Sequence, residues 1–307
     1  MSSSITADMS GLSQALIGLV ERTAAGVVAV KSAPYRVVSG VILGGNLVAV
    51  ADHSLRREDR IAIQTANGTT AEATILGRDQ SLDLGFLKVG DHDLKPLTPA
   101  DPASLKAGTL AAVVGLTIDA GPSASLGILG AVGGSRRTWR GGTLDHFLRL
   151  DVNLYPSQSG AAVVNAEGHL IGLATPALLR HSAVAVPVTT LRRIADELLK
   201  EGRIRHGYLG VGLHPVAIPG LRAKLGLTAE AGLILLSVEP ESPADAAGWL
   251  VGDILISLDG TPIIDIDELQ TALRGNAVGR TLKASLLRGG ELLETQVTVS
   301  ERTKKRT

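Results

Sequence analysis

The sequence predicts a mainly β protein, in which a long region of short strands is followed by a small domain of mixed strands and helices. About eleven apolar, β-branched runs, among them RVVSGVIL, NLVAVA and AAVVN, follow one another at regular spacing with no helical pattern between them. Helical periodicity is confined to residues 11–22, 188–200 and 267–274. Strands without intervening helices favour barrels or a sandwich over a parallel sheet. After Gly202 the pattern changes, and the roughly 95 residues that follow are enough for a small independent domain.

The expected helices carry apolar stripes and recognisable ends. Their apolar residues recur at three- and four-residue spacing, which places them on one helix face. Ser10 can cap the first helix, and Gly202 follows the second as a terminator. The stripes consist of Leu12, Leu16, Leu19 and Val20 in the first helix and of Leu191, Ile194, Leu198 and Leu199 in the second.

The strand region divides into two halves. Hairpin-type turns occur at Asn67-Gly68 and at Ala166-Glu167-Gly168. The segment LTPADPASL, residues 97–105, interrupts the strands and is typical of a crossover between two substructures. We therefore expect an N-terminal segment with a short helix (1–24), a strand region (25–202) with halves of about 25–100 and 103–187, a second domain (203–301) and a basic tail (302–307).

Composition argues against several classes of protein. Lys and Arg together number 30, as do Asp and Glu, and this zero balance argues against a nucleic-acid-binding surface. The chain has no cysteine, which excludes disulfides and thiolate metal sites. No His, Asp or Glu cluster has the spacing of metal ligands, so we expect neither a metal nor an organic cofactor. No apolar run reaches the roughly 18 residues of a membrane-spanning helix.

The first residues lack the pattern of a secretory signal. No Lys or Arg precedes Arg22, so no basic segment leads into an apolar one. The chain as written is therefore expected in the cytoplasm, or in the periplasm if a leader was removed.

The segment NLYPSQSGAAVVNAEGHLIGLAT, residues 153–175, places Ser159 in a tight turn of small residues. Serine beside glycine is ordinary turn chemistry, and a nucleophilic role requires a base, an orienting carboxylate and an oxyanion site. His53 follows the apolar run NLVAVAD and opens a turn, and Asp83 opens the apolar run DLGFLKV. Each of them also fits a plain surface or turn position, but the order His, Asp, Ser is that of chymotrypsin-type barrels.

Five segments, in this order, resemble the successive motifs of the HtrA/Deg family of serine proteases. They are SGVIL with VADHSL, GRDQSLDLGFLKV, LAAVVG, LDVNLYPSQSGAAVVNAEGHLIGLAT and AVAVPV. The C-terminal region resembles a PDZ domain through RHGYLGV, SPADAAGWLVGDIL and LRGGE, and the resemblance covers about residues 11–300. It implies a mainly β fold, with a chymotrypsin-like double β-barrel followed by a small α+β PDZ domain. It also implies a triad in which Ser159 is the nucleophile, His53 the base and Asp83 the orienting acid.

The oxyanion loop departs from the family pattern. Where the family has Gly-Asn-Ser-Gly-Gly, this chain has SQSGA, residues 157–161. The resemblance assigns the oxyanion hole to the N–H groups of Ser157 and Ser159, and the usual glycine at 157 permits a backbone angle that a side chain resists by about 1–2 kcal/mol. Three outcomes fit this change: the loop simply tolerates the small Ser157, Ser157 is strained, or the loop flips and loses one donor, at a cost on the order of 10²–10³ in rate. A milder departure is Ser54, which follows His53 in place of a β-branched residue.

The resemblance also implies where substrates and peptides bind. The S1 pocket, which receives the side chain before the cleaved bond, would be small and apolar, and this predicts cleavage after Val, Ala or Leu. In the PDZ domain a loop would hold the peptide carboxylate, strand 232–238 would pair with the peptide, and helix 267–274 would form the other wall. The residues are Asn153, Ala174, Thr175 and Val184 for S1, Tyr208, Leu209, Gly210 and Val211 for the loop, and Leu269 and Leu273, facing the peptide or the core, for the helix.

Two functions fit these observations. The first is an ATP-independent serine endopeptidase that acts on unfolded or exposed polypeptides and recognises C-terminal peptides through its PDZ domain. The alternative, motivated by the altered oxyanion loop, is a catalytically impaired protease-fold scaffold that binds peptides through its PDZ domain. The resemblance further implies homo-trimers or larger multiples, with trimer contacts through N-terminal aromatic residues, and Tyr35 is the only aromatic residue among the first 80. The expected partners are polypeptide substrates and C-terminal peptides, with no nucleic acid.

Overall fold

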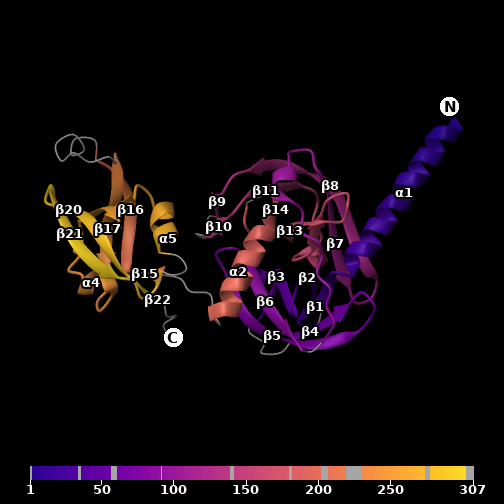
Figure 1. Cartoon of the computed structure of the whole chain (residues 1–307), viewed down its shortest axis with the longest axis horizontal. Coiled ribbons are helices and arrows are strands. Elements are labelled where there is room, and N and C mark those ends of the chain that lie inside the picture. Colours follow the sequence, from indigo (N-terminus) through magenta and orange to yellow (C-terminus); the bar gives the residue numbers. More distant parts are fainter. Residues whose placement is uncertain are drawn as a thin grey trace. The chain divides into compact units, whose positions relative to one another are not determined.

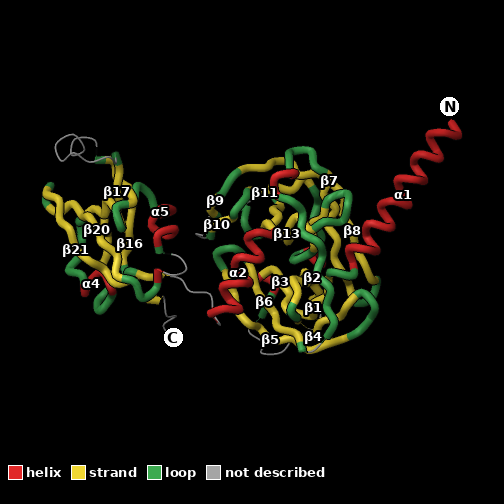
Figure 2. The backbone as a smooth tube through the Cα atoms, in the orientation of Figure 1, coloured by secondary structure: helices red, strands yellow, loops and turns green. Residues whose placement is uncertain are grey.

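The computed structural model describes residues 2–33, 36–56, 61–90, 92–138, 142–179, 182–201, 207–218, 230–273 and 277–301. The chain folds as two compact units, Met1–Ile204 and Arg205–Thr307 (Figure 1). Strands predominate in both units (Figure 2), which confirms the mainly β fold class. The expected basic tail and Tyr35 lie outside the described residues.

The first barrel closes six antiparallel strands in the order β1-β2-β3-β6-β5-β4. Because the barrel is closed, each strand pairs with a neighbour on both sides. The β-branched side chains of the strands pack well on a pleated, buried surface. Val30, Ile42 and Leu87 belong to the buried cluster inside the barrel. The predicted Asn67-Gly68 turn is confirmed between β4 and β5. The strands are β1 (Val27–Ala33), β2 (Arg36–Gly44), β3 (Leu47–Ala51), β4 (Ile61–Thr65), β5 (Thr70–Asp79) and β6 (Leu84–Val89).

The second barrel closes another six antiparallel strands in the order β11-β14-β13-β12-β7-β8. Val113, Leu129 and Ile171 belong to its buried cluster, and the predicted turn ending in Gly168 is confirmed between β12 and β13. A short 3-10 helix, η2 (Pro102–Ser104), lies in the connection between the barrels. The strands are β7 (Leu110–Thr117), β8 (Gly121–Gly133), β11 (Phe147–Asp151), β12 (Ala162–Val164), β13 (Leu170–Thr175) and β14 (Ala183–Pro187), with the separate pair β9 (Arg136–Arg137) and β10 (Thr143–Leu144).

Helix α2 (Val188–Glu201) follows the second barrel and packs against both barrels. Its residues Leu191, Ile194 and Leu198 are buried in a cluster that also contains side chains of the two barrels, so the predicted stripe is largely confirmed. Leu199, expected on the same stripe, is 54% exposed. That expectation was wrong because Leu198 already fills the last buried position of the helix.

Helix α1 (Ser2–Ala24) begins well before the expected residue 11. Its C-terminal part packs on the barrels through Leu19, which is buried. Its N-terminal part extends away from them (Figure 1), and Met9 and Leu12 are exposed there. Among the helices in the described part of the chain, none combines the length and apolar character needed to cross a membrane.

The described part of the second unit is rich in strands and contains two short helices. Its main sheet has the order β16-β17-β18-β20-β21, β19 pairs with β18, and β15 pairs separately with β22. Trp249 is buried in the core, together with Leu235 and Leu286. The elements are β15 (Gly207–Tyr208), β16 (Val211–Ala217), β17 (Ala231–Val238), α4 (Pro243–Ala246), β18 (Ile254–Leu258), β19 (Thr261–Pro262), α5 (Ile266–Ala272), β20 (Thr281–Arg288), β21 (Glu291–Thr298) and β22 (Ser300–Glu301).

An ion pair fixes the turn that leads into β18. The Asp253 carboxylate accepts hydrogen bonds from Arg288 Nε and Nη2 at 2.8 Å each, and from the Leu250 N–H at 2.8 Å. Burial by itself would raise the pKa of Asp253, but the hydrogen bonds from Arg288 and Leu250 and the charge of Arg288 outweigh burial and lower this pKa. The carboxylate therefore stays charged and holds the turn against β20.

Candidate active site

Strand pairing in the first barrel brings His53 and Asp83 together. Ala51, the last residue of β3, pairs with Leu84, the first residue of β6. The segment that follows β3 and the segment that precedes β6 are therefore neighbours. His53 lies in the 3-10 helix η1 (Asp52–Ser54) that follows β3. The Asp52 N–H donates to Asp83 O at 3.0 Å, and the His53 N–H donates to Asp83 Oδ1 at 2.9 Å.

The imidazole of His53 is held by a fully buried carboxylate. His53 Nδ1 lies 2.8 Å from Asp83 Oδ2 and 3.1 Å from Oδ1. Because a carboxylate only accepts, Nδ1 carries the proton and Nε2 is left as the acceptor of the neutral ring. Thr175 at the end of β13 donates its hydroxyl to Asp83 Oδ2 at 2.5 Å, so the second barrel also orients the acid. Asp83 has a φ of 55°, in the left-handed region that Asp tolerates better than most residues.

Ser159 completes this arrangement from the second barrel. It follows the 3-10 helix η3 (Pro156–Gln158) and precedes β12, and its Oγ lies 3.0 Å from His53 Nε2. The hydroxyl can therefore pass its proton to the imidazole as its oxygen attacks a carbonyl carbon. The structure brings together all three residues that the sequence resemblance assigned to the triad.

The turn that carries Ser159 is seated against β2 of the first barrel. Gly160 has a φ of +82°, and a Cβ at this position would lie 2.2 Å from Ser39 O. The Ser39 N–H donates to Ser159 O at 3.1 Å, and Ser39 Oγ donates to Ser157 O at 2.7 Å. Ser39 Oγ also accepts the Leu116 N–H of β7 at 3.0 Å. Sequence reasoning missed Ser39; its signal is a polar residue in the otherwise apolar run RVVSGVIL.

The oxyanion loop forms a closed 3-10 turn. The Ser159 N–H donates to Pro156 O at 3.3 Å, and the Gln158 N–H donates to Tyr155 O at 2.9 Å. Ser157 is not among the non-glycine residues with positive φ in the described part of the chain. In this structure the N–H of Ser159 is thus engaged within the loop, and Ser157 keeps an ordinary backbone angle.

Gln158, directly before the nucleophile, braces this turn from inside the barrel. Its side chain is fully buried, and Oε1 accepts the Tyr155 N–H at 3.1 Å and the Ser125 hydroxyl at 3.0 Å. The longer glutamine side chain at the family's asparagine position thereby ties both ends of η3 to β8.

A second ion pair fixes the turn that carries His53. Arg78 on β5 pairs through Nε with Asp52 Oδ1, and its Nη2 donates to Asp52 O at 3.1 Å and to Leu55 O at 3.4 Å. The flanks of His53 are therefore tied to the wall of the first barrel. No local pattern indicates that Arg78 and Asp52 form a pair, because they are 26 positions apart in the chain.

Of the residues assigned to the S1 pocket, Ala174, Thr175 and Val184 are fully buried on neighbouring strands next to the Ser159 turn. Ala174 O accepts the Gly160 N–H at 2.9 Å, and Thr175 on β13 pairs in register with Val184 on β14. The Thr175 hydroxyl is engaged with Asp83, while Asn153 is exposed. The assignment of Asn153, Ala174, Thr175 and Val184 to a substrate pocket stays a prediction.

The loop assigned to peptide binding packs at the start of α4. Gly210 has a φ of +80°, and a Cβ there would lie 2.1 Å from the Cβ of Ser242, the N-cap of α4. The Ala244 N–H donates to Leu209 O at 2.9 Å, and the Glu239 N–H donates to Gly210 O at 2.8 Å. These contacts give the loop a defined shape that glycine alone permits at position 210.

The strand expected to pair with a peptide needs correction. The sequence reading assigned this role to residues 232–238, but β17 is paired with β16 on one side and β18 on the other. Within the described residues β16, which begins at Val211, lies at one edge of the sheet, and β21 lies at the other. Leu269 and Leu273, for which a peptide-facing role was left open, are buried in the core of this unit.

Comparisons with known proteins agree with this geometry. Residues 38–173 match the trypsin-like peptidase domain model, and residues 207–299 match the PDZ domain model. The periplasmic pH-dependent serine endoprotease DegQ of Escherichia coli (strain K12) is 30% identical over 273 residues, which cover 86% of this chain and 59% of that protein. The serine endoprotease DegS of Haemophilus influenzae is 24% identical over 273 residues, which cover 86% of this chain and 76% of that protein.

Solved structures share the fold over nearly the whole chain. The serine endoprotease from Yersinia pestis has a TM-score of 0.75 at 26% identity and covers 93% of this chain and 97% of its own. The HtrA-type protease AlgW with decapeptide has a TM-score of 0.78 at 23% identity and covers 93% and 98%, a likeness of fold.

A double barrel joined to a PDZ domain, with this serine, histidine and aspartate at the meeting of the barrels, defines the class of PDZ-containing trypsin-like peptidases. The relatives and solved structures named above are Deg, HtrA-type or serine endoproteases. The chain belongs to the HtrA type, and the resemblance in its sequence motifs is confirmed.

Proposed function

We propose that the chain is an ATP-independent serine endopeptidase that cleaves unfolded or exposed polypeptides. The observation that carries this proposal is the continuous hydrogen-bond chain from Ser159 Oγ to His53 Nε2 at 3.0 Å and from His53 Nδ1 to Asp83 Oδ2 at 2.8 Å. A serine hydroxyl is a weak nucleophile until an adjacent base can take its proton. The names of the relatives as serine endoproteases support the proposal.

In this proposal His53 serves first as base and then as acid. Ser159 Oγ attacks the carbonyl carbon of the peptide bond, and its proton moves to His53 Nε2. The imidazolium then gives this proton to the leaving amine, which frees the new N-terminus. Asp83 stabilises the imidazolium and holds the ring in one orientation. Water repeats the sequence and releases the acyl group from Ser159.

We propose that the N–H groups of Ser157 and Ser159 form the oxyanion hole once the loop leaves its 3-10 turn. In the turn the Ser159 N–H donates to Pro156 O and is not available to a substrate oxygen. A flip of the peptide group between Pro156 and Ser157 turns that carbonyl away and brings the Ser157 N–H toward the nucleophile. The flip places Ser157 in a backbone region that glycine adopts more readily, at a cost of about 1–2 kcal/mol.

For specificity, we propose cleavage after small aliphatic residues. Ala174 is one backbone hydrogen bond away from the nucleophile turn, and Val184 lies beside Thr175 on the neighbouring strand. These positions carry no carboxylate that could pair with Lys or Arg, which favours Val, Ala or Leu before the cleaved bond. A peptide library that varies this residue tests the assignment, and a preference for Lys or Arg contradicts it.

The PDZ unit is proposed to bind C-terminal peptides at Tyr208, Leu209, Gly210 and Val211. A peptide would extend the sheet along β16, whose outer edge continues directly from this loop. Fluorescence anisotropy with a labelled peptide that has a free carboxylate should show binding. The same peptide with an amidated C-terminus is the control, and equal binding of both contradicts a carboxylate-holding loop.

The endopeptidase proposal is tested with casein and with a fluorophosphonate probe. The wild type should degrade casein and become labelled at Ser159, and Ser159→Ala should do neither. If a folded wild type neither degrades casein nor becomes labelled, the endopeptidase proposal is wrong. The alternative function, a scaffold that binds peptides through its PDZ domain, would then be favoured.

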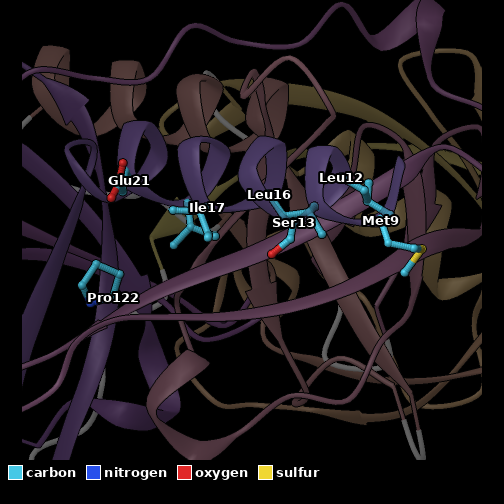
Figure 3. A pocket seen from close by; sticks show the side chains of 8 residues that line it. Met9, Leu12, Ser13, Leu16, Ile17, Glu21 and Pro122 are labelled. Carbon is cyan, nitrogen blue, oxygen red and sulfur yellow. The ribbon is translucent and has the colours of Figure 1, made fainter. Parts of the chain in front are cut away.

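We also propose that the chain assembles as a homo-trimer. An apolar hollow of about 470 Å³ lies along α1, between Met9, Leu12 and Ile17 of the helix and Pro122 at the start of β8 (Figure 3). Met9 and Leu12 are 61% and 51% exposed, so this face leaves apolar area for another copy to cover. Light scattering should give about 95 kDa, three times 31.7 kDa, and a lower mass for Leu12→Glu. A monomeric wild type contradicts the proposal.

The proposed compartment is the periplasm. DegQ of Escherichia coli is named a periplasmic endoprotease, which supports this location for a related chain. Fractionation of the source cells tests it, and recovery of the protein with cytoplasmic markers contradicts it.

A further inference from the structure

Ser54 brings a hydroxyl to the catalytic centre that the triad leaves unused. It directly follows His53 in η1, and it is 1% exposed. Its Oγ lies 3.3 Å from Ser159 Oγ, in a site where Ser159 is also buried. Within the described residues, Ser159 Oγ is the hydrogen-bond partner that the structure gives to the Ser54 side chain.

The neighbouring hydrogen bonds fix which hydroxyl is the donor. His53 uses its Nδ1–H on Asp83, so Nε2 accepts the Ser159 hydroxyl at 3.0 Å. With its proton directed at Nε2, Ser159 Oγ can only accept from Ser54. The donors thus point one way along a chain from Ser54 through Ser159 and His53 to Asp83. Each hydrogen bond in such a chain polarises the next.

We propose that Ser54 donates a hydrogen bond to the nucleophile oxygen and stabilises this oxygen as it leaves the acyl-enzyme. The inference rests on the proposed endopeptidase function. It adds a fourth side chain to the reacting centre at a position where the sequence departs from the family's β-branched residue.

The effect belongs to deacylation. Water attacks the acyl carbonyl carbon and gives a proton to His53 Nε2. The bond between that carbon and Ser159 Oγ then breaks, its electron pair stays on Oγ, and His53 returns the proton to Oγ. Ser54 keeps its own proton throughout. Its hydrogen bond strengthens as negative charge develops on Oγ, because hydrogen bonds to charged acceptors are the stronger ones.

Acylation gains less from the same hydroxyl. In the free enzyme Ser159 Oγ is already a good acceptor, so the hydrogen bond from Ser54 exists before the attack as well as during it. In the acyl-enzyme the corresponding atom is an ester oxygen, which is a poor acceptor. Since only an interaction that is stronger in the transition state accelerates a step, Ser54 speeds deacylation more than acylation.

The experiment compares Ser54→Ala with Ser32→Ala. Ser32 is a matched control because it is a buried serine of the same barrel whose Oγ donates to Arg36 O at 3.3 Å, away from the triad. Stopped-flow assays with a nitrophenyl ester of a small aliphatic amino acid give the deacylation rate. Fluorophosphonate labelling reports the attack by Ser159 alone. Ser54→Cys, with a weaker donor of similar shape, is a second variant if the alanine variant does not fold.

Ser54→Ala should lower the deacylation rate about tenfold, the worth of one hydrogen bond, and should produce a burst of nitrophenol. Its labelling rate should change by less than about threefold. Ser54→Cys should fall between this variant and the wild type, and Ser32→Ala should match the wild type in both assays.

Two kinds of result overturn the inference. The first is a kinetic result for Ser54→Ala: either labelling and deacylation slow by the same factor, which indicates a structural role, or neither rate falls. A crystal structure of the wild type in which Ser54 Oγ lies beyond hydrogen-bond distance of Ser159 Oγ overturns it without any assay. Failure of the wild type to label contradicts the proposed function instead, and the crystal structure then still decides whether the Ser54 hydrogen bond exists.

Discussion

The two sides of the candidate active site are built differently. On the base side, His53 and Thr175 hold the buried Asp83 carboxylate through hydrogen bonds of 2.8 and 2.5 Å. On the oxyanion side, the loop before Ser159 closes on itself, and the Ser159 N–H donates to Pro156 O. The groups proposed to move the proton are already hydrogen-bonded in line in this structure, whereas the Ser159 N–H, one of the two proposed oxyanion donors, is engaged elsewhere.

This difference follows from how each side is attached to the fold. His53 and Asp83 are next to paired strands of a closed barrel, where the register of β3 and β6 fixes their separation. The oxyanion loop is a short turn that contacts β2 of the first barrel through hydrogen bonds from Ser39 Oγ to Ser157 O and from the Ser39 N–H to Ser159 O. A turn can change by one peptide flip, but a barrel strand cannot shift without breaking its ladder. The oxyanion side is therefore where the rate of this protein is most open to change.

The largest effect is expected from Asp83→Asn, which breaks the base side. The amide would donate to Nδ1 and favour the wrong tautomer of His53, so kcat should fall about 10⁴-fold with little change in KM. Steady-state kinetics on a peptide substrate measures this. A loss below about tenfold would show that the base side does not depend on this carboxylate.

The next effect is a gain, from Ser157→Gly on the oxyanion side. Glycine adopts the flipped backbone without strain and frees the Ser159 N–H, so kcat should rise, by up to 10²–10³ if one donor is missing in the wild type. Ser157→Ala is the matched control, because it keeps the Cβ and should show no gain. Equal rates for the glycine variant and the wild type would mean that the loop opens without cost, and the contrast between the two sides would vanish.

Much of the fold could be predicted because its signals are local. The helix expected at residues 188–200 is found at Val188–Glu201, since its apolar spacing repeats over nearly four turns. The order of His53, Asp83 and Ser159 along the chain, with their flanking motifs, pointed to three residues that the structure brings within hydrogen-bond distance. Strand runs and glycine turns were equally local, and both hairpin turns were found.

The missed features depend on contacts between distant segments. Ser39 joins residues 118 and 77 positions away, and no pattern around it indicates those partners. The edge strand of the PDZ unit was misassigned because β17 is the more apolar run, whereas β16 contains His214 and Pro215, and the pairing that places β16 at the edge joins distant segments. The conformation of the oxyanion loop depends on the orientation of the peptide group between Pro156 and Ser157. The residue types limit this orientation but do not determine it.

The free energies of unfolding of two glycine variants test how tightly the turn that carries Ser159 packs against β2. Gly160 lies where this turn meets β2. Gly160→Ala adds a Cβ 2.2 Å from Ser39 O in a left-handed backbone, whereas Gly168→Ala has a similar φ of +85° and its Cβ would only touch Leu19 Cδ1 at 3.4 Å. Both should lose about 1–2 kcal/mol from the backbone angle, and Gly160→Ala should lose roughly 1–3 kcal/mol more from the clash. Urea unfolding measures both, and equal losses would mean that the turn is not pressed against the first barrel.

The smallest effect is expected from Ser39→Ala, which removes the side-chain hydrogen bond from β2 to the oxyanion loop and keeps the backbone hydrogen bond to Ser159 O. Ser39 Oγ accepts the Leu116 N–H and donates to Ser157 O, so the variant leaves two backbone groups without this partner and should lose about 1–3 kcal/mol of stability. Ser32→Ala, which removes a hydroxyl bound to a single carbonyl, should lose less. Because His53 and Asp83 do not depend on Ser39, fluorophosphonate labelling should stay within about tenfold of the wild type. A large loss of labelling in a folded Ser39→Ala protein would contradict this expectation. It would show that the hydrogen bonds among Ser159, His53 and Asp83 also depend on Ser39.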